Sequence, residues 1–298
     1  QTPEDSAHWA DDNLRLGEPR RPKKNGLPCK EGIQKKAKTF LRRCHDLKLD
    51  AIGITDHNFS RRSDPDDWFI THLVEQNKKV AKELSRDPII IFPGFEVDIG
   101  YHVLCLFQPV SNSKALSKCN ENLTKLGLSV EQRFDGNAAR PLRRNNSYVS
   151  LNELIELVQN EMCGIVIAAH SDSDDGMLVD AKNKEDFKNP QLYCVEVTKN
   201  PPAPKYLDIL EGGNTNWKSE GFYLAYIMSS DAKSLKTESC GKPKPNSLGY
   251  RHTWIKMSKP SIEALRQAFL DPVSRIKLPK DVTTDKNPSV LSNYPYIK

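Results

Sequence analysis

The sequence predicts an α/β fold built mostly from parallel strands. Short apolar runs alternate along the chain with longer stretches in which apolar residues recur every three or four positions. Alternation of this kind is typical of a sheet whose strands are connected by helices. The chain has 298 residues, of which 37% are hydrophobic. This is enough for one large domain or two small ones, and a single α/β barrel commonly has this length.

Each predicted helix follows from the spacing of its apolar residues. In the first one, Ile33, Ala37 and Phe40 fall on one face. Another begins after Ser150, which has Glu153 at the spacing of a capping box. In chain order, the predicted helices cover residues 32–47, 68–84, 151–160 and 261–270.

The predicted strands are short apolar runs, and even the longest of them, 88–95, is far below the roughly 18 apolar residues of a membrane-spanning helix. We therefore expect no membrane partner. In chain order, the strands cover residues 49–55, 88–95, 101–107, 164–169, 193–197, 223–228 and 251–257. Two polar stretches break the alternation: 111–147 is interpreted as an insertion within a domain of residues 1–275, and 276–298 as an exit linker.

Charge and cysteine content narrow the functional classes. The net charge is +5, and basic runs at 20–24, 35–38 and 140–144 are either solvated surface or contacts to a phosphate backbone. Seven cysteines without a C-x-x-C pair argue against both a disulfide framework and a structural zinc site. A reducing, cytoplasmic location is expected.

Acidic and imidazole side chains stand at the ends of several predicted strands. Because the carboxyl ends of parallel strands meet at one mouth of a barrel, such groups could together bind divalent metals through nitrogen and oxygen. Each residue alone has a structural alternative: a single histidine is more often a surface residue, and an Asp-His pair can be turn chemistry. The residues concerned are Asp56, His57, Glu96, His102, His170 and Asp231, with Glu196 as a possible supporting residue.

Five segments in this order resemble the successive motifs of the PHP (polymerase and histidinol phosphatase) superfamily of metal-dependent phosphoesterases. They are IGITDHN (52–58), FPGFE (92–96), YHVL (101–104), VIAAH (166–170) and SSDA (229–232). The resemblance covers roughly residues 1–275 and implies a distorted barrel of seven strand–helix units around a cluster of two or three metal ions. The two departures described below reduce this expectation to one to two divalent ions, Zn, Mn, Fe or Mg. The resemblance implies these metal ligands: His57, Glu96, His102, His170 and Asp231.

The later segments 250–257 and 265–272 resemble the PHP domain at the head of TrlF-type, SMC-like ATPases. That resemblance implies an ATPase domain or subunit as a partner, and a possible role in defence against phage. The phosphate-binding motif of such an ATPase, G-x-x-x-x-G-K-[ST], does not occur in this sequence.

Two positions depart from the PHP pattern. The family opens with a strand ending in His-x-His, whereas this chain begins Gln1-Thr2-Pro3, so the first strand is expected to be missing or truncated. The closing Asp-x-His motif has Lys233 in place of its histidine. A lysine ammonium is no metal ligand, but it can bind phosphate. We therefore predict Asp56, His57 and Lys233 as catalytic residues, and Arg251 together with Lys233 as substrate contacts.

Three functions remain open. The basic runs and the TrlF-type ending favour a phosphodiesterase or nuclease that acts on nucleic acid. The same metal site would serve a small-molecule phosphatase of the histidinol-phosphatase type. Lys233 and the absent opening motif favour a non-catalytic PHP module with a structural or regulatory role.

Overall fold

The computed structural model describes residues 1–5, 9–10, 14, 16, 30–60, 62, 64–129, 132–133, 141–217 and 224–279. Its α-helices are α1 Lys30–Asp46, α2 Phe69–Glu83, α3 Leu116–Lys125, α4 Leu151–Ile155, α5 Lys184–Phe187, α6 Pro204–Leu210, α7 Ile262–Leu270 and α8 Pro272–Arg275. Its strands are β1 Ala51–Ile54, β2 Ile90–Asp98, β3 His102–Leu106, β4 Arg143–Arg144, β5 Ser147–Tyr148, β6 Ile165–Ala168, β7 Cys194–Glu196, β8 Ala225–Ile227, β9 Trp254–Ile255 and β10 Ile276–Lys277. Most of the predicted linker, 280–298, lies outside the described residues.

The predicted α/β class is confirmed, and the fold is compatible with a distorted (β/α) barrel. Six strands form the main sheet in the order β1-β2-β3-β6-β7-β8. The β1–β2, β6–β7 and β7–β8 pairs are parallel, as the alternation with helices requires, but β2 and β3 run antiparallel. Only residues 99–101 connect β2 to β3, and a parallel crossover needs a connection of about a dozen residues or more.

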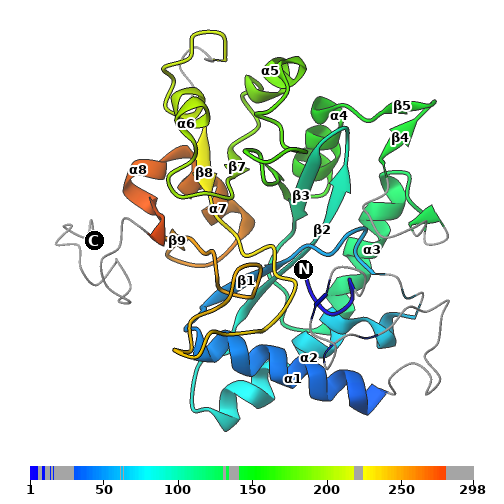
Figure 1. Cartoon of the computed structure of the whole chain (residues 1–298). Coiled ribbons are helices and arrows are strands. Elements are labelled where there is room, and N and C mark those ends of the chain that lie inside the picture. The colour runs from blue at the N-terminus through cyan, green and yellow to red at the C-terminus, as the bar shows by residue number, and fades with distance from the viewer. Residues whose placement is uncertain are drawn as a thin grey trace. The chain divides into compact units, whose positions relative to one another are not determined.

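The chain divides into two compact units, which are described separately. Unit 1 comprises residues 1–166 and 230–250, and unit 2 comprises residues 167–229 and 251–298. In unit 1, α1 and α2 pack side by side (Figure 1). The Phe40 ring lies 6.3 Å from the Trp9 ring and 5.9 Å from the Phe69 ring, measured between centroids. The apolar face predicted for the first helix thus takes part in aromatic packing.

Strand β2 is the central element of unit 1, since it pairs with β1 on one side and β3 on the other and its interior residues are buried. Gly94 lies on β2 opposite Leu106 of β3. A methyl group at Gly94 would sit 2.1 Å from the carbonyl oxygen of Cys105 on β3. The glycine therefore sets the spacing of the β2–β3 pair.

Three elements differ from their predicted form. The helix expected at 151–160 is α-helical only to Ile155 and continues as a π-helical segment, Glu156–Glu161. The strand expected at 251–257 is reduced to β9, which pairs antiparallel with β10. Part of the stretch interpreted as an insertion forms α3, whose buried Leu116, Cys119 and Leu123 have helical spacing.

In unit 2, strands β7 and β8 are parallel neighbours and helix α7 contacts β8. Helix α7 buries Leu265 and Phe269, while the hydroxyl of Ser261 accepts a hydrogen bond from the Ala264 amide at its start. Within the described ranges, no helix has the length and apolar character needed to cross a membrane.

Candidate metal centre

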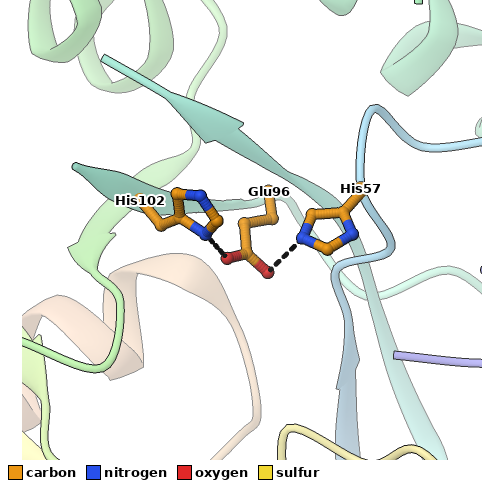
Figure 2. Close-up of side chains that lie close together, drawn as sticks. All are labelled: His57, Glu96 and His102. Atoms are coloured by element: carbon orange, nitrogen blue, oxygen red, sulfur yellow. Dashed lines mark hydrogen bonds and ion pairs between the residues drawn. The ribbon is translucent and has the colours of Figure 1, made fainter. Parts of the chain in front are cut away.

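Three of the predicted ligands come together in unit 1. One ligand atom from each of His57, Glu96 and His102 lies within 4.8 Å of the other two. The two carboxylate oxygens of Glu96 face different histidines: Oε1 is 2.6 Å from His102 Nδ1, and Oε2 is 3.8 Å from His57 Nε2 (Figure 2). His57 and Glu96 are buried, and His102 is 23% exposed.

Backbone pairing places these side chains. The chain leaving β1 continues to pair with β2, because the Glu96 amide donates to the Asp56 carbonyl and the Asn58 amide donates to the Glu96 carbonyl. His57 is thereby held beside Glu96. In the antiparallel β2–β3 pair, His102 lies opposite Asp98 and diagonal to Glu96, a separation that long side chains can bridge.

The ligand set fits a divalent transition metal. Two imidazole nitrogens and one carboxylate oxygen are ligands common to zinc, manganese and iron sites in proteins. A buried carboxylate between two histidines also provides the negative charge that such a cation requires. These three residues are therefore the candidate metal centre of the described part of the chain.

Asp5 orients His57, a role that the sequence did not indicate. Its Oδ2 lies 2.6 Å from His57 Nδ1, so that the other ring nitrogen, Nε2, is the one directed at Glu96. Metal-binding histidines usually use their second nitrogen in this way, with a carboxylate fixing the tautomer and the ring orientation. Burial alone would lower the pKa of His57, but the contact with Asp5 and the charge of Glu96 outweigh burial and raise it.

The segment that carries Asp5 is held by hydrogen bonds to Asp56, Ser60 and Phe69. The amide and hydroxyl of Thr2 donate to the two oxygens of Asp56, each at 2.5 Å. Glu4 accepts from the Ser60 hydroxyl at 2.8 Å and from the Phe69 amide at the start of α2 at 2.9 Å. Thr2, Glu4 and Asp5 are all buried. This buried segment therefore lies next to His57.

Replacing Asp5 by Ala is expected to weaken metal binding about 10- to 100-fold, the range typical for the loss of an outer partner of a ligating histidine. Asp5→Asn should weaken it less, because the amide oxygen can still accept from His57 Nδ1. Metal affinity can be measured by competition with a chromophoric chelator. Asp50→Ala, an exposed aspartate of unit 1, is the control. Unchanged affinity in Asp5→Ala would contradict the orienting role.

The remaining predicted residues of unit 1 lie as follows. Asp56, predicted as catalytic, is buried and bound by Thr2, and burial raises its pKa to about 7. Asp231, predicted as a ligand, has a positive φ of 41° and forms an ion pair with Lys233, whose Nζ lies 3.3 Å from Asp231 Oδ2. Asp231 is not one of the three residues of the candidate centre.

Unit 2 holds His170, Glu196 and Arg251. The His170 amide donates to Glu196 Oε2 at 3.1 Å, and its ring Nδ1 lies 3.1 Å from the Ser173 hydroxyl. Glu196 is buried, which raises its pKa, and it also accepts from the Ser229 hydroxyl. Arg251 donates to the carbonyls of Ser229 and Thr198, at 2.8 and 3.4 Å. The serine partners were not predicted, because only spatial proximity identifies them.

Comparison with known proteins gives a remote structural likeness. No protein-family model matches the chain, and no curated protein matches it. Among solved structures, a match is the crystal structure of an Endonuclease Q complex with a 27-mer duplex substrate that has an abasic lesion at the active site. The identity is 15% and the TM-score 0.44, over 80% of this chain and 52% of that chain. The present chain thus spans about half the length of that protein.

Fold and site together define an α/β protein with a candidate two-histidine, one-glutamate metal centre. The carboxylate of Asp5 contacts that centre at His57 Nδ1, the ring nitrogen that is not directed at Glu96.

Proposed function

We propose that this chain is a metal-dependent phosphoesterase module of the PHP type that hydrolyses phosphodiester bonds in nucleic acid. The cluster of His57, Glu96 and His102 carries this proposal, because a site of this composition arises from three of the motifs that resemble the PHP series. When bound, the ion supplies Lewis-acid activation of the phosphoester and of water.

The protein's own residues have separate parts in this proposal. His57, Glu96 and His102 hold the ion, and Asp5 keeps the His57 ring oriented. Burial excludes bulk water from His57 and Glu96, while the partly exposed His102 marks the side from which substrate enters. Asp56 fixes the backbone that precedes His57 through its bonds to Thr2.

Finer parts of the proposal come from the motif resemblance. His170 and Asp231 would be further metal ligands, and Lys233 and Arg251 would contact substrate phosphates. The ion would be Zn, Mn, Fe or Mg. The module would work in the cytoplasm, coupled to an SMC-like ATPase domain or subunit, in defence against phage.

A second function, a non-catalytic PHP module, is favoured by one observation. The Lys233 ammonium forms an ion pair with Asp231, so it neutralises one of the carboxylates that the resemblance implies as ligands. Fewer ions would remain for catalysis if that pair persists, and the domain would then act as a structural or regulatory part.

Hydrolysis assays on the full chain separate the two functions. Protein stripped of metal and reloaded with Mn or Zn should cleave labelled single-stranded DNA, RNA or duplex DNA. His102→Ala is expected to lower both metal content and cleavage, by more than about a hundredfold for cleavage, since it removes a direct ligand rather than an outer partner. A parent protein that binds metal but cleaves none of these substrates, nor bis-p-nitrophenyl phosphate, would leave the non-catalytic module.

A further inference from the structure

A basic hairpin projects from unit 1. Strands β4 and β5 pair antiparallel through Arg143–Tyr148 and Arg144–Ser147, and Asn145 and Asn146 form the turn between them (Figure 1). Both asparagines have positive φ, 48° and 66°, as a two-residue turn matching the twist of a hairpin requires. All of residues 143–148 are exposed.

The base of this hairpin is fixed to the strand pair that carries two of the candidate ligands. The Leu142 amide donates to the Asp98 carbonyl at 2.7 Å, and the Val149 amide donates to the Leu142 carbonyl at 2.9 Å. Leu142 and Val149 are buried, whereas the residues between them are exposed. Asp98 is the strand partner of His102. The hairpin is therefore mounted at the end of the β2–β3 pair where His102 lies.

The exposed side chains combine positive charge with an aromatic surface. The Arg143 guanidinium lies 4.6 Å from the centroid of the Tyr148 ring, which is 43% exposed. Arg144 forms an ion pair with Glu153. Arg143 therefore carries most of the positive charge of the hairpin that is not paired with a carboxylate. The sequence from 143 to 148, RRNNSY, contains no acidic residue.

Nucleic acid is the partner that this chemistry fits. Arginine binds phosphate oxygens, and asparagine and serine side chains donate hydrogen bonds to the backbone. Exposed aromatic rings beside arginine provide a stacking surface for unpaired bases.

We propose that the hairpin Arg143–Tyr148 is a nucleic-acid-binding arm that holds a strand beside the candidate metal centre. This inference rests on the proposed function, because it assigns the substrate contact of that phosphoesterase. The basic run at 140–144 was interpreted either as solvated surface or as a contact to a phosphate backbone. For the described residues of that run, the proposal selects the phosphate contact.

Binding without catalysis tests the arm. Fluorescence anisotropy of labelled single-stranded DNA, single-stranded RNA and duplex DNA is measured with the full chain in EDTA, across a salt series. Arg143→Ala combined with Tyr148→Ala is expected to weaken single-strand binding about tenfold or more. Arg143→Ala alone should reduce the salt slope by about one phosphate contact, and Arg144→Ala should have the smaller effect.

Lys118→Ala on α3 is the matched control, because Lys118 is also basic and exposed, with a side chain that is 62% accessible and, like that of Arg144, paired with a glutamate. It should leave binding unchanged, and no variant should change the metal content. Equal binding by the parent and the double variant would overturn the arm, as would a parent that binds no nucleic acid. If that parent still hydrolyses bis-p-nitrophenyl phosphate with metal, the phosphoesterase proposal survives. Nucleic-acid binding that depends on the arm, in a protein that takes up no metal, would support the arm and contradict the phosphoesterase proposal. The three probes distinguish DNA, RNA and duplex as the ligand.

Discussion

Protein carrying Glu96→Gln is expected to lose its metal. The Glu96 carboxylate is the only one among the three clustered residues, and its two oxygens face His57 and His102. Glutamine keeps the shape of the side chain but removes its charge, and it turns an NH₂ group toward one histidine. The loss in affinity should exceed the roughly 100-fold upper range for outer partners of ligands.

Elemental analysis after dialysis, followed by calorimetric titration with Zn or Mn, measures this effect. Glu121→Gln is the matched control, because it makes the same chemical change at a side chain of α3 that is 58% exposed. A Glu96→Gln protein that keeps an equivalent of metal and the parent's affinity would place the ion elsewhere in the molecule.

Gly94→Ala should disrupt the site without touching any ligand. The added methyl group would overlap the carbonyl oxygen of Cys105, a backbone atom of the β2–β3 pair that cannot move without displacing the strand. Ordinary overpacking costs about 1–3 kcal/mol because side chains can yield. A backbone clash allows no such relief, so we expect the free energy of unfolding to fall by more than about 3 kcal/mol.

Gly53→Ala on β1 is the matched substitution, since its methyl group would meet only the side chain of Leu106, at 3.2 Å. Urea denaturation should therefore show a large shift for Gly94→Ala and a small one for Gly53→Ala. Soluble Gly94→Ala protein should also bind metal more weakly, because β3 positions His102. Equal unfolding midpoints for the two variants would show that the strands can separate freely at this point.

Local patterns in the sequence were sufficient to predict the long helices. The helices predicted at 32–47 and 68–84 correspond to α1 and α2 with ends shifted by one or two residues. Their apolar faces are defined within the helix itself, so no distant contact was needed. Helix α3 escaped prediction because its three buried apolar residues stand in a stretch otherwise rich in polar residues.

Strand direction and outer contacts were harder to predict. The short connection at 99–101 was a usable signal that β2 and β3 are antiparallel, although the surrounding alternation favoured parallel strands. No sequence signal connects Asp5 to His57, since the two residues meet only through the fold. The motif resemblance named His57, Glu96 and His102 among five expected ligands, and the structure brings these three together; which of the five bind metal stays a prediction.

Asp98 belongs to two structures at once, since its backbone anchors the exposed hairpin and pairs with His102. A displacement of the hairpin thus acts on the strand partner of a candidate ligand. Thermodynamic linkage makes any such coupling reciprocal: the factor by which metal changes the affinity for nucleic acid equals the factor by which nucleic acid changes the affinity for metal. A measured change in metal affinity on adding nucleic acid would then also give the change in nucleic-acid affinity on adding metal.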